Sequence, residues 1–193
     1  MANASLTSLL DAINTLLDCV GESPINSLEV SGLVDVAKAK ALLAETSLAV
    51  QTSGWDFNTE KSYPLVRTTD GTIVLTPNTL KVSLSDKYSD LNVIQRGLKL
   101  YDKKNHTMTF TKDLLVDIVF YLPWDDLPQA ARRYIMIKAS RIYQARELGS
   151  DTQHRFSERE EFDASVDFND AEGSSSNYNM FSDSWSVAGL LNR

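Results

Sequence analysis

The spacing of hydrophobic residues changes twice along this sequence, and that change constrains the fold more than any other feature. In residues 5–20 and 33–53 apolar side chains recur every three or four positions, as on one face of an α-helix. In residues 55–122 apolar and polar side chains tend to alternate, as in half-buried strands. In residues 127–148 the helical spacing returns. We therefore expect an α+β fold, a helical bundle with an inserted antiparallel β region.

The ends of the first two helices carry local signals. Asn3 or Ser5 can cap the first helix, and Gly21 follows its last apolar residue. Gly54 suits the left-handed position after the second helix, and Trp55 is then expected to fold back and be buried. The apolar side of the second helix is expected to comprise Val34, Ala37, Ala41, Leu48 and nearby Leu and Ala residues, with Lys38, Lys40 and Glu45 in water.

The middle of the chain predicts two hairpins and two further strands. Asp70-Gly71 is a strong turn signal, and the polar loop 102–106 is a second. Residues 80–84 alternate cleanly. The expected strands are Tyr63–Val66 and Thr72–Leu75 around the first turn, Leu98–Tyr101 and Met108–Phe110 around the second, Leu80–Leu84, and Leu114–Leu122.

A polar fourth helix is expected over residues 152–168, followed by a flexible stretch at residues 173–176. The segment beyond it is unusually apolar, which suggests an extended C-terminal arm that orders on a partner or packs on its own domain. The predicted organisation is thus residues 1–54, N-terminal helices; 55–122, β region; 123–172, C-terminal helices; and 173–193, arm. Candidate docking anchors in the arm are Tyr178, Phe181, Trp185, Leu190 and Leu191.

Composition excludes several classes of protein. The net charge is −7, which argues against a sequence-independent nucleic-acid binder. Cys19 is the only cysteine, so no internal disulfide forms, and neither His106 nor His154 has the spacing of a metal site. No apolar run is long enough to span a bilayer. We expect a protein made in the cytoplasm, with no membrane segment, no cofactor and no metal.

Two charged helix faces remain open to interpretation. The cluster Glu158, Glu160 and Glu161 could supply hydrolase carboxylates, but alternating arginines favour a solvated ion-pair surface. A basic side on the third helix could contact nucleic acid, although an acidic neighbour fits the chain's overall charge better. One candidate contact between subunits therefore pairs the acidic cluster with the basic residues Arg132, Arg133 and Arg141.

Several short blocks, in this order along nearly the whole chain, resemble the tail tubular protein A family, the adaptor or gatekeeper proteins of short-tailed bacteriophages. Each block alone is a weak signal, and the resemblance rests on all of them occurring in register along the chain. The blocks are Gly21-Glu22-Ser23-Pro24-Ile25, Gln51-Thr52-Ser53-Gly54-Trp55-Asp56-Phe57-Asn58, Arg96-Gly97 leading to Leu100-Tyr101-Asp102, Leu127-Pro128-Gln129-Ala130-Ala131-Arg132-Arg133-Tyr134-Ile135 with Lys138-Ala139-Ser140-Arg141, Asn177-Tyr178-Asn179-Met180 and Gly189-Leu190-Leu191-Asn192-Arg193.

The resemblance implies a structural subunit of the virion tail and no enzyme. It implies a homo-oligomeric ring of twelve copies that joins the portal protein to the tail nozzle, tail tubular protein B, and extends the DNA channel. An acidic wall suits a channel that DNA passes without specific binding. The alternatives are a virion-associated cell-wall hydrolase that uses the cluster at Glu158, and a small cytoplasmic binding module or chaperone.

Overall fold

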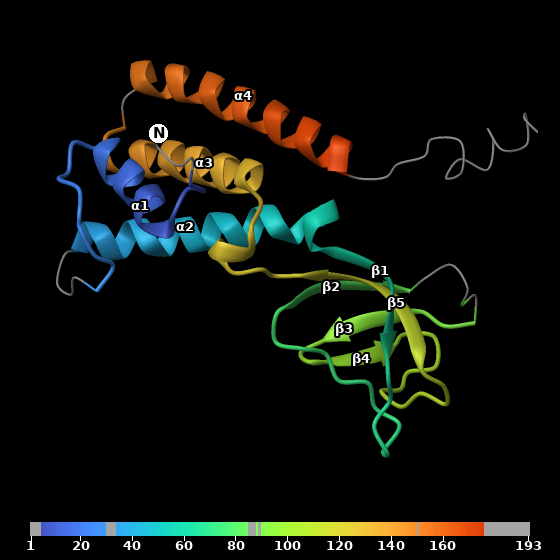
Figure 1. The fold of residues 1–193 in the computed structure, drawn as a ribbon. Helices are drawn as coiled ribbons and strands as arrows, with labels where there is room; N and C mark the ends of the chain where they lie inside the picture. Colours follow the sequence, from blue (N-terminus) through green and yellow to red (C-terminus); the bar gives the residue numbers. More distant parts are fainter. Residues whose placement is uncertain (1–4, 30–33, 85–87, 89, 150, 176–193) are drawn as a thin grey trace, which may run out of the picture.

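The computed structural model describes residues 5–29, 34–84, 88, 90–149 and 151–175. Packed helices form one part of the molecule, and a β region projects from their end (Figure 1). The elements in chain order are α1 (Leu9–Asp18), α2 (Val34–Thr52), the 3-10 turn η1 (Asp56–Asn58), β1 (Thr59–Leu65), β2 (Thr79–Leu84), β3 (Val93–Arg96), β4 (Lys99–Asp102), β5 (Leu114–Phe120), the 3-10 turn η2 (Trp124–Asp126), α3 (Gln129–Glu147) and α4 (Asp151–Ser175). The predicted α+β class and the β region between helices are confirmed.

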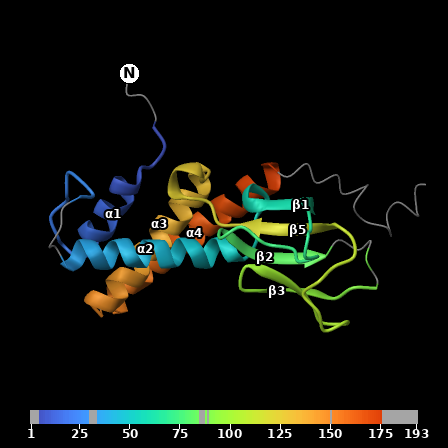
Figure 2. The ribbon, with the colours of Figure 1, turned by 90° about the horizontal axis from the view of Figure 1, so that it is seen from below.

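Helices α1, α2 and α3 enclose the first hydrophobic core, and α4 lies along the outer side of α3 (Figures 1 and 2). Leu16, Leu43 and Ile135 are fully buried where the first three helices meet. Their burial removes apolar surface from water, which is the main force that holds the helices together. From α4, Phe168 reaches this core.

Helix α1 begins later than expected. Its N-cap is Ser8: the Asp11 amide donates to Ser8 Oγ at 3.1 Å, and the Ser8 amide donates to Asp11 Oδ2 at 3.1 Å. The prediction of a cap at Ser5 is wrong because only Ser8 has an acid three residues later to complete the capping box. Asn3 lies outside the described residues.

Helix α2 is confirmed, but the four residues named for its apolar face are wrong. Val34 and Leu48 are exposed, at 67% and 47%, and Ala37 and Ala41 also face outward. The core face instead carries Val36, Ala39, Leu42, Leu43, Thr46, Ser47, Val50 and Gln51. Buried polar side chains on this face weaken the contrast between the two sides of the helix, which explains the error. The Lys40 ammonium, expected in water, donates to the Leu28 carbonyl.

The larger sheet has three antiparallel strands in the order β1-β5-β2. The expected strand at residues 80–84 is confirmed as β2, and the last expected strand is β5, at the centre. Strand β1 has a register shift between Glu60 and Tyr63, where Ser62 has φ +56. The Ser62 amide donates to Asp117 Oδ1 at 2.9 Å, so the bulge is tied to the central strand.

In both expected hairpins, the strands predicted to pair with each other have other partners. The turn at Gly71 forms, with φ +79, but residues 72–75 make only isolated bridges, Thr72 to Thr109 and Val74 to Lys99. Strand β1 pairs with β5 instead. Strand β4 pairs with β3 through the tight turn at Gly97, and residues 108–110 form no strand. Turn residues mark where the chain reverses, whereas burial of distant residues decides which strands pair.

The β region has its own core, which continues to the helices through Leu122. Its fully buried side chains include Ile73 and Leu100. At the junction, Asn58 Nδ2 donates to the carbonyls of Gln51 at 3.0 Å and Phe120 at 2.9 Å. One buried amide therefore connects the end of α2 to the end of β5.

Gly54 ends α2 with φ +81, as predicted. A Cβ atom there would lie 3.1 Å from Val119 Cγ2, so the position also lacks room. Trp55 is half-buried, less than expected, and its Nε1 donates to the Val50 carbonyl at 2.8 Å. The side chain does fold back on the last turn of the helix.

Helix α4 is longer than expected and continues through Gly173, Ser174 and Ser175. The prediction of a flexible stretch is wrong for these three residues, and Ser176 lies outside the described residues. Ser174 Oγ donates to the Ala171 carbonyl at 2.8 Å, which satisfies a carbonyl near the helix end. A structural arm can therefore begin only after Ser175.

Candidate assembly surfaces

Side chains of opposite charge meet at the contact between α3 and α4. Arg141 Nε forms a charged hydrogen bond with Glu161, and Lys138 Nζ lies 3.8 Å from the same carboxylate. Further along, Arg133 NH1 lies 2.9 Å from Asp167 Oδ2. Sequence reasoning expected the basic side of this helix to meet an acidic helix of a neighbouring subunit. In the structure, residues of α3 and α4 form such ion pairs within one subunit.

Arg132, a candidate inter-subunit residue, is buried at 4% exposure. Its NH1 donates to the Thr7 carbonyl at 2.9 Å, and its Nε donates to the Leu127 carbonyl at 2.9 Å. Trp124 Nε1 donates to the Thr7 carbonyl as well, at 3.0 Å. Buried Arg132 thus holds the segment before α1 against the start of α3, and it is not exposed for a partner.

An aromatic cluster attaches the far end of α4. Phe168, which is 1% exposed, has its ring centroid 4.4 Å from that of Trp55, 6.3 Å from that of Phe57 and 5.4 Å from that of Tyr134. Contacts of this kind add to the free energy gained from area burial. Phe168 therefore joins α4, α3 and the segment after α2 at one point.

Glu172 adds a polar contact beside this cluster. Its Oε2 accepts a hydrogen bond from the Asp56 amide at 2.7 Å, at the start of η1. Burial nevertheless raises the pKa of Glu172 above its usual value, because desolvation outweighs the hydrogen bonds from the backbone.

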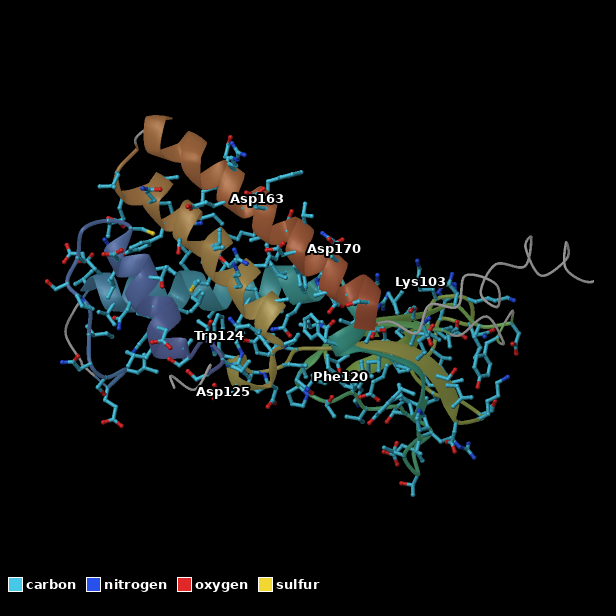
Figure 3. The ribbon with its side chains drawn as sticks, turned by 45° about the horizontal axis from the view of Figure 1, so that its top comes forward. Lys103, Phe120, Trp124, Asp125, Asp163 and Asp170 are labelled. Carbon is cyan, nitrogen blue, oxygen red and sulfur yellow. The ribbon has the colours of Figure 1, made fainter. Side chains whose placement is uncertain are left out.

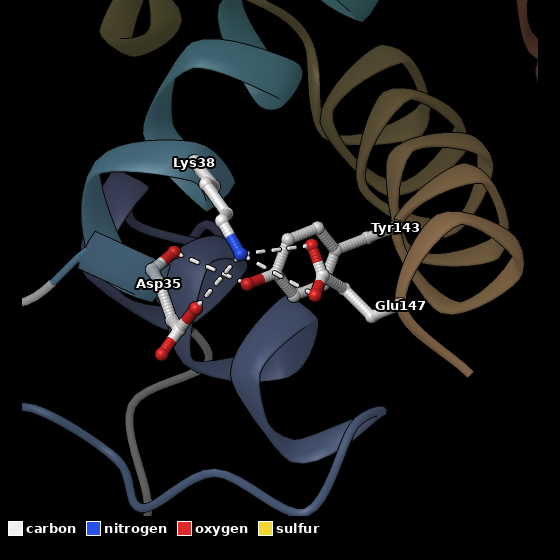
Figure 4. Close-up of polar contacts among 4 residues, drawn as sticks. All are labelled: Asp35, Lys38, Tyr143 and Glu147. Carbon is white, nitrogen blue, oxygen red and sulfur yellow. Dashed lines mark hydrogen bonds and ion pairs between the residues drawn. The ribbon is translucent and has the colours of Figure 1, made fainter.

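At the other end of the helical part, a charged network joins α2 to α3 (Figure 4). Lys38 Nζ lies 3.2 Å from Asp35 Oδ1 and 3.1 Å from Glu147 Oε1. The Tyr143 hydroxyl donates to the Asp35 carbonyl at 3.2 Å. Both carboxylates raise the pKa of Lys38, so its ammonium stays charged at neutral pH. The network fixes the distance between the two helices.

The outer face of α4 carries apolar side chains between acids. Phe162 and Val166 are 66% and 41% exposed, and they lie one helical turn apart. Asp163 and Asp170 lie along the same outer side (Figure 3). We call Phe162, Asp163, Val166 and Asp170 the α4 ridge. Glu158 and Glu160, nearer the start of the described side chains, are also exposed.

An apolar groove runs along the side of α2. It consists of two adjoining hollows of about 310 and 420 Å³, which share Ala44 and Tyr121. The first is bounded by Leu9 and Ile13 of α1, and the second by Leu48 and Pro77. Figure 1 shows α3 between α2 and α4, so the groove and the α4 ridge belong to helices on opposite sides of α3.

Candidate catalytic groups are dispersed. Within the described residues, no group of three or more His, Cys, Asp and Glu side chains could hold a metal. Cys19 is half-buried, and desolvation raises the pKa of its thiol, which disfavours the thiolate. His106 Nδ1 lies 3.4 Å from the Tyr101 hydroxyl in an exposed loop. Of the acidic cluster, Glu161 is held by Arg141, whereas Glu158 and Glu160 face solvent.

The candidate docking anchors lie outside the described residues: Tyr178, Phe181, Trp185, Leu190 and Leu191. The side chain of His154 is likewise outside them. No helix in the described part of the chain combines the length and apolarity needed to cross a bilayer.

Comparison with known proteins decides the family. The sequence model of the family described as tail tubular protein matches residues 10–178. The chain belongs to the tail tubular protein family. A relative is tail tubular protein A of Klebsiella phage KP34, which is 28% identical over 145 residues, 75% of this chain and 76% of the relative. Membership makes the chain a structural component of the bacteriophage tail, located in the virion.

For a tail tubular protein, the exposed apolar positions are the informative ones, and sequence reasoning missed their role. Phe162 and Val166 are apolar residues of a helix that the sequence predicts to be polar, and both face outward. Phe168, four residues beyond Ala164, is the residue that contacts the core. The signal was present, because Glu161, Ala164 and Phe168 share a face that excludes Phe162 and Val166.

Proposed function

We propose that the chain forms a homo-oligomeric ring, of twelve copies, which joins the portal protein to the tail nozzle and extends the DNA channel. The observation that carries this proposal is the separation of exposed apolar side chains into different surfaces of one subunit, among them the α2 groove, the α4 ridge and the side of the β region that carries Val74 and Leu98. A ring subunit needs two different surfaces, because each copy contacts one neighbour on each side. Family membership supports a role in the tail.

The proposed role is mechanical and requires no catalysis. Among the described residues, Glu158 and Glu160 of the acidic cluster are exposed, and Glu161 is paired with Arg141. A glycoside hydrolase needs a general acid whose pKa is raised by burial, and no exposed carboxylate meets that need. The hydrolase alternative therefore finds no support. The net charge of −7 agrees with a conduit that repels DNA.

The portal contact is proposed for the residues after Ser175. Their aromatic and leucine side chains are of the kinds that dominate interface energies, and twelve arms would act together. We take this segment to begin after Ser175 rather than at Gly173, since α4 includes Gly173.

The test compares the full chain with a variant truncated after Ser175. We expect the truncated protein to keep its melting temperature, because Phe168 and Glu172 remain in place. It should no longer co-sediment with purified portal rings, which the full chain binds. A truncated protein that binds portal rings as tightly as the full chain contradicts the docking role of the segment. A full chain that neither oligomerises nor binds portal contradicts the adaptor function itself.

A further inference from the structure

The β3–β4 hairpin carries a basic face. Directly opposite residues of an antiparallel pair share one side of the ladder, and Arg96 stands opposite Lys99. Lys103 and Lys104 follow in the exposed loop. Across the described residues, none of these four cations has a carboxylate within ion-pair distance. Like charges directly opposite each other destabilise a ladder, so an anionic partner would relieve the repulsion between Arg96 and Lys99.

Apolar side chains lie among these cations. Val74 is bridged to Lys99 and is 50% exposed, while Leu98, at the turn, is 48% exposed. Since Ile73 and Leu100 are fully buried, alternation places Val74 and Lys99 on the outward side. Such a mixture of apolar and charged groups is typical of a protein contact.

The aromatic ring of Tyr101 orders this surface. The Arg96 guanidinium carbon lies 3.5 Å from the centroid of the Tyr101 ring. Stacking of this kind restrains a long side chain, so less conformational entropy is lost when a partner binds. We call Val74, Arg96, Leu98, Lys99 and Tyr101 the hairpin face.

The α4 ridge is the chemical complement of the hairpin face. It presents Phe162 and Val166 beside Asp163 and Asp170, whereas the hairpin face presents Val74 and Leu98 among cations. The basic residues of α3 cannot serve the ridge, because they are buried or paired inside the subunit, as Arg141 is with Glu161. Exposed charges of opposite sign, each set beside exposed apolar side chains, therefore occur on the ridge and on the hairpin.

The two surfaces lie on opposite sides of the molecule. In Figure 1, α4 runs along the top of the helical part, and the β3–β4 hairpin lies below the three-stranded sheet. Within one subunit they cannot meet. In a head-to-tail ring, the ridge of each subunit can meet the hairpin of the next, which is the arrangement that a cyclic assembly requires.

We propose that the α4 ridge of one subunit packs on the hairpin face of a second copy of this chain. The acids of the ridge face Arg96 and Lys99, and the apolar side chains of both surfaces are buried between them. This inference rests on the proposed ring and names the contact that closes it. Duplex DNA fits the hairpin face less well, because phosphates offer nothing to cover Val74 and Leu98.

The test uses charge reversal in two variants. The ridge variant carries Asp163→Lys and Asp170→Lys, and the face variant carries Arg96→Glu and Lys99→Glu. A matched control reverses two exposed charges of the β region elsewhere, Asp70→Lys and Lys81→Glu. Assembly is followed by sedimentation velocity and native mass spectrometry across a range of protein concentrations, with and without portal rings. Thermal melting verifies that each variant folds.

Each reversed variant should need a concentration at least about tenfold higher than the wild type to assemble, because like charges then face each other. The control should assemble as the wild type does. An equimolar mixture of the ridge and face variants should assemble near the wild-type concentration, since alternating copies restore opposite charges at every contact. That recovery is specific to a head-to-tail pairing of these two surfaces.

Three results would overturn the inference. Rings that form normally from either reversed variant show that the ring exists but closes elsewhere. A face variant that assembles normally and loses duplex DNA in a mobility-shift assay assigns the hairpin face to DNA. A wild-type chain that remains monomeric both with and without portal rings contradicts the proposed ring and, with it, the proposed contact between the α4 ridge and the hairpin face.

Discussion

Gln51 and Leu122, 71 positions apart in the chain, exchange two hydrogen bonds: Gln51 Nε2 donates to the Leu122 carbonyl at 3.0 Å, and the Leu122 amide donates to Gln51 Oε1 at 2.8 Å. Gln51 is fully buried at the end of α2, and Leu122 contacts both hydrophobic cores. The side-chain amide of Gln51 thus pairs with the backbone just after β5 in the way that a neighbouring strand would. This pair, with Asn58, fixes the β region to the helices.

Replacing Gln51 with Leu should therefore lower the free energy of unfolding by about 2–4 kcal/mol. The variant has an apolar side chain of similar size but leaves the amide and carbonyl of half-buried Leu122 without the partners that Gln51 supplies. Urea unfolding followed by circular dichroism measures the change. Thr52→Ala, in the same turn but exposed, is the control and should change stability by less than about 0.5 kcal/mol. Equal effects of the two substitutions would contradict the role given to Gln51.

Gly54 and Gly21 form a matched pair for the helix-end argument, since both have φ +81. A Cβ atom at Gly54 meets Val119 at 3.1 Å, whereas one at Gly21 meets nothing within 4 Å. Gly21→Val should cost the backbone strain alone, about 1–2 kcal/mol, and Gly54→Val should cost clearly more. Melting temperatures of the two variants give the comparison. A neutral Gly54→Val, or an equal loss at both sites, would refute the steric part of the account.

The pair Arg141–Glu161 should control how firmly α4 is attached. Both side chains are partly buried, at 24% and 17% exposure, so Arg141→Glu should destabilise the protein by about 1–3 kcal/mol. The amides of α4 should then exchange hydrogen faster. The double variant Arg141→Glu with Glu161→Arg should recover most of the loss. Arg133→Glu is the control, because its exposed pair with Asp167 is worth less than about 1 kcal/mol. Unchanged exchange in α4 would mean that the pair does not hold the helix.

Glu172 predicts a specific pH dependence. Its pKa in the folded protein is raised above the ordinary value of 4.5, so the folded state binds this proton more tightly than the unfolded state does. The group therefore favours folding below its ordinary pKa, and that contribution is lost as pH rises through the raised pKa. Glu172→Gln cannot ionise, yet its oxygen can still accept from the Asp56 amide. Relative to the wild type, the variant should gain stability between about pH 4 and pH 7 in urea titrations. A relative loss over this range would contradict the assignment.

Local signals in the sequence predicted the helices and the chain reversals at Gly71 and in the loop 102–106, but not the turn at Gly97 between β3 and β4. Gly54 and Gly71 adopt the positive φ angles that their turns require. The strand partners could not be predicted in the same way, because β1 pairs with β5, far along the chain. Part of the face of α2 was misassigned because Thr46, Ser47 and Gln51 are buried there beside leucines. The burial of Gln51 is favourable because of its hydrogen bonds to Leu122, which are tertiary and cannot be predicted from local sequence.

The candidate assembly surfaces, too, could be predicted only in part from the sequence. The charges of α3 and α4 were predicted to pair between subunits; Arg141 and Glu161 pair within one subunit, and the contact between subunits stays a prediction. Sequence could not tell whether the two helices belong to one subunit or to two. The hairpin face could not be predicted from the sequence, because Val74 and Lys99 become neighbours only through a bridge between segments far apart in the chain.

The central claim is that twelve copies of this chain form a ring between portal and nozzle. Electron cryomicroscopy of the tail in intact particles tests it most directly. We predict a closed ring of twelve subunits around the DNA channel, each with α4 against the β3–β4 hairpin of its neighbour and its C-terminal segment on the portal. A tail in which this chain lies outside the channel, or is present in copies that make no ring, would contradict the account.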